Sequence, residues 1–259
     1  MSEPVRIHKA LADAGVASRR RAEQLVVEGR VTVNGIPAGV GQLVYPARDV
    51  LAVNGTTVPA AEKRLYLALA KPAGVTSTVS DRHADRTVID LVPGALRQRA
   101  ARLYPVGRLD RDSEGLLLLT NDGDWAQRLL HPSHGVEREY AVGLERPLDA
   151  QQTDDLERGV QLSEGLATLS NLRVATSADV RLLGQLIGRD AYQLTWYRVT
   201  LRQGMKRQIR RMFSAVEAPV ARLVRVRIGT LRITGMRLGD VRELSPSERG
   251  ALDALSSAR

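Results

Sequence analysis

The sequence predicts an α+β protein of two unequal units, a small one over residues 1–60 and a larger one over residues 61–259. Three observations predict this organisation. A chain of 259 residues suits one large domain or two unequal ones. Residues 56–64 contain a proline and no apolar periodicity, which is typical of a linker. Beyond them, strand patterns outnumber helical ones without alternating regularly with them. This favours a mixed, mainly antiparallel sheet flanked by helices over a dinucleotide-binding fold.

The small unit shows two helical patterns followed by short strands. Apolar residues at helical spacing predict a first helix that ends at Gly15: Ile7, Ala10, Leu11 and Ala14. Ser18 is placed to cap a second helix, whose inward face is Ala22, Leu25 and Val26. Asn34-Gly35 and Asn54-Gly55 each follow a short apolar segment, and such pairs predict tight turns between strands.

The larger unit is predicted to contain mostly short apolar strands. Strands are expected over residues 65–70, 116–120, 140–144 and 197–201. Helices are expected over residues 124–130, over residues 204–213 and after the capping box Ser245-Pro246-Ser247-Glu248. Residues 175–191 match no such pattern, so a loop or hairpin insertion is predicted there.

Composition excludes several kinds of site. The chain has no cysteine, which excludes disulfides, thiol catalysis and cysteine-ligated metals and fits a reducing compartment. Its four histidines argue against a multi-histidine metal centre. The first ten residues are charged and carry no secretion signal, and no apolar run approaches the ~20 residues that span a bilayer. We therefore expect a cytoplasmic protein that does not enter a membrane.

Positive charge is concentrated in one segment, which we call the basic band. The whole chain carries 38 Lys and Arg against 29 Asp and Glu, a formal net charge of +9. The band holds nine basic residues and one acid, Glu217, and so carries +8: Arg202, Lys206, Arg207, Arg210, Arg211, Arg222, Arg225, Arg227 and Arg232. A concentration of this kind indicates a polyanion such as nucleic acid, although a solvated face of salt bridges has the same composition.

Three arginines open the second predicted helix. Arg19, Arg20 and Arg21 occupy its first turn, where the helix dipole favours acids. An external anion such as an RNA phosphate would neutralise them. The alternative is a frayed turn in solvent.

The segment from Gly107 to Gly115 is dense in polar residues, and three interpretations compete. Its acids begin like a calcium loop, but Asn121 stands where that loop needs a bidentate glutamate, which argues against calcium. A second interpretation is a structural turn whose acids pair with nearby arginines. A third is a catalytic carboxylate with an arginine partner, held rigid by the leucine strand that follows.

The segment from Gly204 to Phe213 predicts an amphipathic helix. One face carries Arg207, Arg210 and Arg211, and the opposite face carries Ile209, Met212 and Phe213. One side therefore packs while the other meets anions or carboxylates.

Several segments, taken in order, carry a resemblance to a known family. They are Lys71-Pro72-Ala73-Gly74, Gly107-Arg108-Leu109-Asp110, Glu114-Gly115-Leu116-Leu117-Leu118, Arg138-Glu139-Tyr140 and Arg207-Gln208-Ile209-Arg210-Arg211-Met212. Over nearly its whole length the chain closely resembles bacterial ribosomal-RNA pseudouridine synthases. Residues 136–140 and 159–162 look most like the large-subunit type B enzymes, with the small-subunit type A enzyme second. Residues 5–55 resemble the small RNA-binding domain named after ribosomal protein S4.

The resemblance implies an isomerase that breaks the bond from ribose to uracil N1, rotates the base and rejoins it through C5. Breaking this bond develops positive charge on the sugar, which a carboxylate can stabilise or attack. The family's essential aspartate corresponds to Asp110, acting as nucleophile or as base on a ribose proton. Tyr140 would stack on the target base, Arg210 would pair with the carboxylate and Leu223 would pack beside the base, which leaves its stack to enter the site. No metal or cofactor is expected.

The resemblance also implies RNA contacts by basic side chains. Besides Arg19, Arg20 and Arg21, the expected contacts are Lys71, Arg108, Lys206, Arg207 and Arg211. The Lys71 segment reads equally well as a turn that ends a strand. Gln203, Met205 and Lys206 depart from the family pattern, which bears on RNA contacts.

Other polar residues in these motifs are expected to have structural roles. Asp112 and Glu114 are expected in the loop or at the surface rather than as a second catalytic acid. His131 and His134 are expected to cap a helix end.

The expected partner is ribosomal RNA, free or in a pre-ribosomal particle, and the expected state is a monomer. A non-catalytic RNA-binding assembly factor would not require Asp110, Tyr140 and Arg210 together. A metal-dependent nuclease lacks a credible ligand set.

Overall fold

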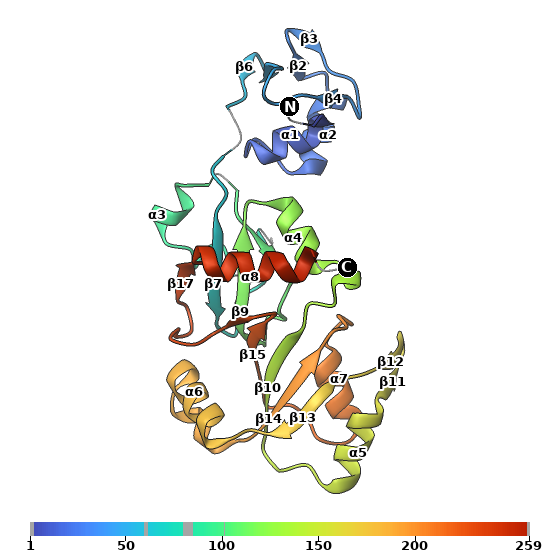
Figure 1. The fold of residues 1–259 in the computed structure, drawn as a ribbon, viewed down its shortest axis with the longest axis vertical. Helices are drawn as coiled ribbons and strands as arrows, with labels where there is room; N and C mark the ends of the chain where they lie inside the picture. The colour runs from blue at the N-terminus through green and yellow to red at the C-terminus, as the bar shows by residue number, and fades with distance from the viewer. Residues whose placement is uncertain (1–2, 60–61, 80–84, 101, 258–259) are drawn as a thin grey trace. The chain divides into compact units, whose positions relative to one another are not determined.

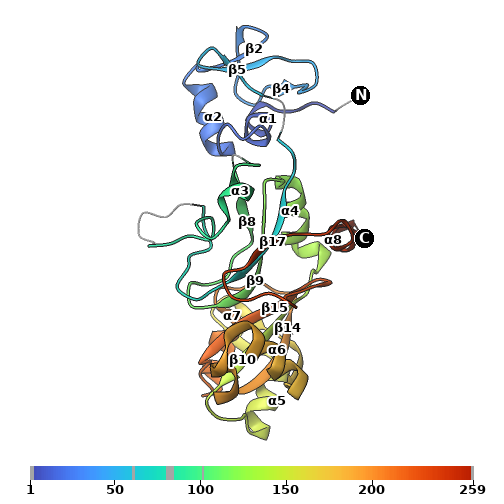
Figure 2. The same ribbon diagram turned by 90° about the vertical axis from the view of Figure 1, so that its left-hand side faces the viewer.

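The computed structural model describes residues 3–59, 62–79, 85–100 and 102–257 (Figures 1 and 2). The chain divides into two compact units. The first comprises Met1–Leu65 with Pro93–Leu103 and Asn121–Gly123, and the second comprises Tyr66–Val92, Tyr104–Thr120 and Asp124–Arg259.

The first unit contains two helices and short strands, as the sequence predicts. Its elements are β1 (Val5–Arg6), α1 (Ile7–Asp13), α2 (Arg19–Val27), β2 (Val31–Val33), β3 (Ile36–Pro37), β4 (Leu43–Val44), β5 (Leu51–Val53), β6 (Thr56–Thr57) and α3 (Gly94–Arg97). Strands β3-β2-β5-β6 form one small sheet and β1-β4 another. The Ser18 hydroxyl accepts a hydrogen bond from the backbone N–H of Arg21 at 3.1 Å, so the predicted helix cap is confirmed.

Tight turns connect the short strands of this unit. Asn34 and Gly35 both have positive φ, 53° and 82°, as a two-residue hairpin turn requires. Asn54 and Gly55 repeat this geometry with φ of 52° and 78°. The predicted linker is partly wrong, because its first two residues form β6, which pairs with β5.

The second unit contains a nine-stranded sheet and most of the helices. Its strands are β7 (Tyr66–Lys71), β8 (Tyr104–Val106), β9 (Glu114–Thr120), β10 (Arg138–Leu144), β11 (Val160–Leu162), β12 (Gly165–Ala167), β13 (Ser170–Val174), β14 (Thr195–Leu201), β15 (Arg222–Ile228), β16 (Leu231–Arg232) and β17 (Val241–Glu243). Its helices are α4 (Gly123–Leu130), α5 (Ala150–Arg158), α6 (Ser177–Ile187), α7 (Gln208–Ala215) and α8 (Pro246–Ser257), with the 3₁₀ turns η1 (Pro132–His134) and η2 (Arg189–Gln193).

The strand order of the large sheet confirms the predicted fold class. It runs β13-β14-β10-β15-β9-β7-β17, with β16 added beside β15 and β8 beside β9. The β9–β15 pair is parallel, and the other named pairs of this sheet are antiparallel. The sheet is therefore mixed and mainly antiparallel, and helices flank it (Figure 1).

Helices α4, α6 and α8 pack apolar side chains into one core with the central strands. Their buried contributions are Trp125, Ala126 and Leu129 from α4, Leu183, Leu186 and Ile187 from α6, and Leu252 from α8. They meet alternate strand residues, among them Ala141 of β10 and Val224 of β15. Because side chains alternate across a strand, the neighbours of these two residues are directed to the other face of the sheet.

Residues 175–191 correct the sequence prediction of a loop or hairpin. The segment contains α6, whose Thr176 and Asp179 form a capping box, followed by η2. Leu183, Leu186 and Ile187 recur at helical spacing and are buried. Gly184 inside this helix and the polar residues ahead of it obscured the pattern.

The amphipathic helix predicted from residue 204 begins later than expected. Residues 204–207 precede α7, and Arg207 has left-handed backbone angles at its N-terminus, φ 51° and ψ 34°. The buried face of the helix is as predicted, since Ile209, Met212 and Phe213 are almost fully buried. Arg207 therefore belongs to the preceding turn rather than to the helix face.

Candidate active site

A cavity of about 500 Å³ opens in the second unit beside strands β10 and β15. Its walls come from the loop after β8, the end of α4 with η1, strands β10 and β15, and the segment from β14 into α7. Half of the twelve site residues singled out from the sequence line it: Arg108, Asp110, Tyr140, Lys206, Arg207 and Leu223. The cavity therefore gathers motifs that are far apart in the chain.

The loop between β8 and β9 presents Asp110 at the cavity. Gly107 begins it with φ +75°, a conformation that favours glycine. The buried hydroxyl of Ser77 donates to the carbonyl oxygen of Leu109 at 2.7 Å and accepts from its N–H at 3.1 Å. Asp110 is thus carried by a clamped backbone, while its side chain is about one-third exposed.

Lys71 holds the same loop from beneath, and this corrects the prediction that it contacts RNA. It ends β7 and is fully buried. Its ammonium donates to the carbonyl oxygens of Asp110 at 3.0 Å and Ser113 at 2.8 Å, and also to that of Pro72 at 3.1 Å. A side chain in this position cannot reach a phosphate at the surface. The strand-ending turn is the interpretation that holds, and Gly74 completes it with φ +84°.

Burial strongly lowers the pKa of Lys71. Loss of water lowers the pKa of its ammonium to about 8, against the opposing attraction of Glu114, Asp112 and Asp110. The nearby positive charge of Arg225 lowers the pKa further.

Two arginines face the acids of the loop, in a pairing that differs from the prediction. Arg207 makes two hydrogen bonds to the carboxylate of Asp112, at 2.8 and 2.9 Å, and lies 3.7 Å from Asp110 Oδ2. Arg210 lies 3.3 Å from Asp112 Oδ2 and donates to the Asp112 carbonyl at 2.9 Å. Within the described residues, Arg210 therefore pairs with Asp112 rather than with Asp110, and Arg207 is the cation beside Asp110.

Charge pairing sets the ionisation of this cluster. The Arg207 hydrogen bonds hold the pKa of Asp112 below its usual range, and Asp112 in turn raises the pKa of Arg207. Burial lowers the pKa of Arg210 despite the attraction of Asp112. The left-handed backbone of Arg207 is uncommon outside glycine, and such strain concentrates at functional sites.

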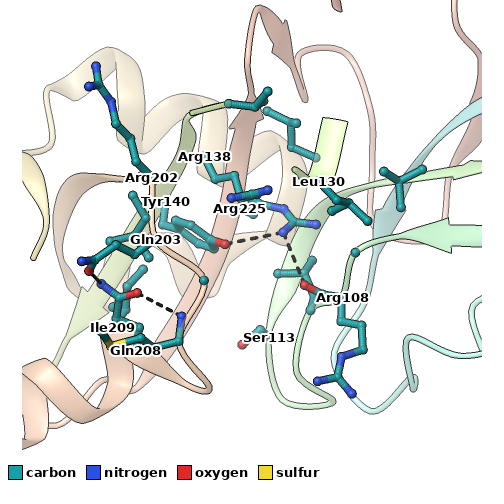
Figure 3. A pocket seen from close by; sticks show the side chains of 18 of the residues that line it. Arg108, Ser113, Leu130, Arg138, Tyr140, Arg202, Gln203, Gln208, Ile209 and Arg225 are labelled. Atoms are coloured by element: carbon teal, nitrogen blue, oxygen red, sulfur yellow. Dashed lines mark hydrogen bonds between the residues drawn. The ribbon is translucent and has the colours of Figure 1, made fainter. Parts of the chain in front are cut away.

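Tyr140 and Leu223 lie on the adjacent strands β10 and β15 and line the cavity. Both are more than nine-tenths buried. Figure 3 shows the Tyr140 hydroxyl pointing toward the guanidinium of Arg225, with Nη1 of Arg225 3.5 Å away. The register pairs Tyr140 directly with Arg225 and then shifts, leaving an extra residue on β15 between Arg225 and Arg227. Irregularities of this kind re-aim side chains beside active sites.

Gly115 lets the two central strands approach. A Cβ at this position would stand 2.2 Å from the carbonyl oxygen of Arg225, and its φ is +105°. Only glycine fits where β9 and β15 run side by side in parallel, directly behind the cavity.

Most of the basic band is neutralised by acids from other segments. Arg202 pairs with Glu137, Arg211 with Glu164, Arg222 with Glu114 and Asp190, and Arg227 with Glu137 and Glu139. The band is therefore largely the salt-bridged face that was the alternative interpretation. Arg211 is held by Glu164, whereas Lys206 and Arg108 are exposed at the cavity.

Glu114 is not a surface residue, contrary to the prediction. It is the first residue of β9, is 3 % exposed and accepts hydrogen bonds from Arg222 at 2.6 and 2.9 Å. Asp112 is half exposed, as predicted for a loop residue. His131 caps η1 by accepting from the Ser133 N–H, and His134 contacts the Arg128 carbonyl at 2.7 Å, so their expected capping roles are confirmed.

In the first unit, Arg19, Arg20 and Arg21 are exposed at the start of α2. Arg21 pairs with Glu28 at 2.9 Å and with the Gln24 side chain. The three side chains remain at the surface where an RNA phosphate could meet them.

Three residues of the site were not assigned a role from the sequence. Ser77 clamps the Asp110 loop, Arg138 lines the cavity, and Arg225 is buried behind Tyr140. Arg225 and Arg227 both alternate with apolar residues in the segment from Leu223 to Ile228, so the sequence pattern does not distinguish the buried Arg225 from the paired Arg227. Ser77 carries no signal either, because only the folded loop brings it to Leu109.

No helix among the described residues is both long and apolar enough to cross a membrane. No group of three or more His, Asp or Glu side chains among them is placed to hold a metal ion.

Sequence and fold comparisons identify the class of protein. The profile of the RNA pseudouridylate synthase family matches residues 65–215, and that of the S4 domain matches residues 5–46. A crystal structure of a pseudouridylate synthase has the same fold, with a TM-score of 0.62 at 24% identity over 96% of this chain and 99% of that one. The chain belongs to the RNA pseudouridine synthase family and carries an N-terminal S4 domain.

Individual relatives are similar over nearly the whole chain. The ribosomal large subunit pseudouridine synthase B of Bacillus subtilis is 36% identical over 97% of this chain and 96% of its own length. The enzyme of the same name from Salmonella typhimurium is 36% identical over 98% of this chain and 84% of its own. An uncharacterized RNA pseudouridine synthase of Mycobacterium tuberculosis is 38% identical over 96% of this chain and 92% of its own.

Proposed function

We propose that this enzyme converts one uridine, or a very few, of large-subunit ribosomal RNA to pseudouridine. The names of the relatives from Bacillus subtilis and Salmonella typhimurium support the large-subunit target. The observation that carries the catalytic assignment is that Asp110, Tyr140 and Leu223 line the same cavity. We infer that the flipped-out uridine enters this cavity.

Asp110 is the proposed catalytic carboxylate. It lines the cavity on a loop fixed by Lys71 and Ser77, which suits a group that must be preorganised. As the glycosidic bond breaks, positive charge develops on the ribose, and the carboxylate stabilises it, attacks C1′ or takes a ribose proton. Arg207, 3.7 Å from Asp110 Oδ2, is the cation that pairs with this carboxylate, where the resemblance implied Arg210.

Tyr140 and Leu223 are the proposed contacts of the base. Both line the cavity from adjacent strands, so a ring between them meets one aromatic and one aliphatic side chain. Stacking of this kind offsets part of the few kcal/mol that unstacking a nucleotide costs. Arg210 then acts on Asp110 indirectly, by holding Asp112 in place.

The proposed partner is ribosomal RNA, free or in a pre-ribosomal particle, bound mainly through phosphate contacts. Arg19, Arg20 and Arg21 supply affinity from the S4 domain, and Arg108 and Lys206 supply it at the cavity. A monomer suffices for the chemistry, because every proposed site residue belongs to this one chain. Ribosomal RNA of bacteria is made and assembled in the cytoplasm, where we place the enzyme.

Pseudouridine mapping tests the function. Unmodified transcripts of large- and small-subunit ribosomal RNA are incubated with the enzyme, labelled with carbodiimide and mapped by primer extension. A new stop on the large-subunit transcript alone is the expected result. A stop on the small-subunit transcript alone would contradict the target. No stop on either transcript or on assembling particles would favour a binding protein.

A further inference from the structure

Arg225 is a buried cation whose partners are all neutral. It is 3 % exposed on β15, at the floor of the cavity. Its Nε donates to the Leu116 carbonyl at 2.7 Å, and its Nη1 lies 3.5 Å from the Arg108 carbonyl and 3.5 Å from the Tyr140 hydroxyl. Its Nη2 is buried with no hydrogen-bond partner among the described residues. No carboxylate of the described chain lies within ion-pair distance of it.

The surroundings of Arg225 add positive charge instead of cancelling it. Burial and the charge of Arg225 together lower the pKa of Arg138, another residue of the cavity wall. Arg225 also lowers the pKa of the buried Lys71. By contrast, Arg222, three residues earlier on the same strand, is neutralised by Glu114.

An unpaired buried charge costs several kcal/mol, so a fold retains one only where something offsets it. Three contacts fix the guanidinium: the Leu116 carbonyl of β9, the Arg108 carbonyl of the loop after β8 and the Tyr140 hydroxyl of β10. Figure 3 shows this guanidinium held between Tyr140 and the Arg108 carbonyl, at the cavity. A fixed cation at the hydroxyl end of the tyrosine that meets the base is placed to stabilise negative charge on that base.

We propose that Arg225 stabilises the uracil anion that forms when the glycosidic bond of the target uridine breaks. The inference rests on the proposed function and deepens it by assigning a group to the leaving base. Asp110 stabilises the positive charge on the ribose, and Arg225 stabilises the negative charge on the base. The two charges that separate in the transition state therefore each meet a fixed opposite charge.

The electron pair of the C1′–N1 bond leaves with N1, so the free uracil is a monoanion delocalised over N1 and the carbonyl oxygens of the base. After rotation, a ring electron pair forms the C5–C1′ bond, C5 loses its proton and N1 gains one. Arg225 stays protonated throughout, as arginine does in proteins, and acts by its charge alone.

The test compares two RNA substrates with each variant. One carries uridine at the target position, and the other carries 5-fluorouridine, whose fluorine makes the departing base a weaker base and a better leaving group. Single-turnover rates of loss of the target nucleoside are measured for wild type, Arg225→Gln and Arg225→Lys. Because both rates come from one preparation, their ratio does not depend on the fraction of folded enzyme. Arg222→Gln is the control, since it removes a neutralised arginine from the same strand.

With Arg225→Gln, the rate on uridine RNA is expected to fall about 10²-fold or more, as for loss of one preorganised charge-stabilising group. The rate on 5-fluorouridine RNA should fall at least tenfold less. For Arg225→Lys, the ratio of the rate on uridine RNA to the rate on 5-fluorouridine RNA should stay within about threefold of the wild-type ratio. Arg222→Gln should leave this ratio unchanged.

Equal losses on the two substrates would overturn the proposal. If they came with weaker RNA binding and a shallower salt dependence, Arg225 would contact a phosphate instead. If binding were unchanged, its role would be structural. A wild-type enzyme that forms no pseudouridine would contradict the proposed function itself, which is a separate outcome.

Discussion

The ammonium of Lys71 lies where water does not reach it, and its hydrogen bonds hold the loop that carries Asp110. Four carbonyl oxygens converge on its ammonium within 3.4 Å. Lys71 therefore supports the site by holding the backbone of the Asp110 loop, and it is not placed to contact RNA.

We predict that the stability contributed at Lys71 rises with pH. Its folded pKa of about 8 lies below the ordinary value of 10.5, so the unfolded chain holds more protons between these values. The free energy of unfolding of wild type relative to Lys71→Met should therefore increase by up to about 2 kcal/mol between pH 7.5 and 9.5. Urea denaturation at the two pH values measures this. A constant or falling difference would contradict the burial of a charged ammonium.

Single residues also show what sequence could and could not predict. Asp110, Tyr140 and Leu223 were predicted from the family resemblance, and the structure brings them to one cavity. The partner of Asp110 was wrong, because whether Arg207 or Arg210 faces it depends on where α7 begins. The left-handed backbone of Arg207 places the start of the helix after this residue, and the spacing of apolar and basic residues in the sequence does not reveal that boundary.

At the scale of elements, the close approach of β9 and β15 builds the floor of the cavity. Gly115 permits it, since any Cβ there would collide with the Arg225 backbone. The glycine of this motif therefore has a packing role, and the leucines after it fill the strand that anchors the loop.

We predict that Gly115→Ala lowers the free energy of unfolding by more than about 3 kcal/mol and abolishes activity. The added methyl meets backbone that cannot yield, at 2.2 Å. Gly165→Ala is the matched control, because Gly165 also has positive φ, +131°, with nothing within 4 Å of a Cβ. It isolates the backbone strain, which costs about 1–2 kcal/mol. Thermal and urea unfolding measure both, and equal losses would show that the collision does not matter.

Helices, strands and turns were predicted well where short-range sequence signals are strong. They were missed where contacts between distant segments determine the structure. The Ser18 cap, the two Asn-Gly turns and the Leu116–Leu119 strand follow from short-range chemistry. Helix α6 was missed because its apolar face is interrupted by Gly184. The basic band was misjudged for another reason: its neutralising acids lie in other segments, and only the folded sheet brings them together.

For the whole molecule, this neutralisation changes where RNA affinity should come from. Most of the band's charges face acids of other segments, so we predict that the exposed arginines that open α2 also supply RNA affinity. Each phosphate contact releases counterions and steepens the salt dependence of binding.

We predict that binding of ribosomal RNA weakens steeply with salt, and that replacing Arg19, Arg20 and Arg21 with Gln reduces the slope. If all three contact phosphates, the slope of log K against log salt falls by about 2–3. The control replaces three other exposed arginines, Arg158, Arg181 and Arg189, and should leave the slope unchanged. Filter binding from low to high salt measures both. Salt-independent binding, or equal slopes for the two variants, would contradict the assignment.

We propose Asp110 as the catalytic carboxylate of this pseudouridine synthase. The direct measurement is single-turnover formation of pseudouridine in large-subunit ribosomal RNA by wild type, Asp110→Asn and Asp112→Asn. The control is closely matched, because Asp112 lies in the same loop and shares Arg207 with Asp110. We predict that Asp110→Asn loses activity by at least about 10³-fold while its RNA affinity is kept. Asp112→Asn should lose less than about tenfold. Activity that survives in Asp110→Asn, or disappears only in Asp112→Asn, would contradict the account.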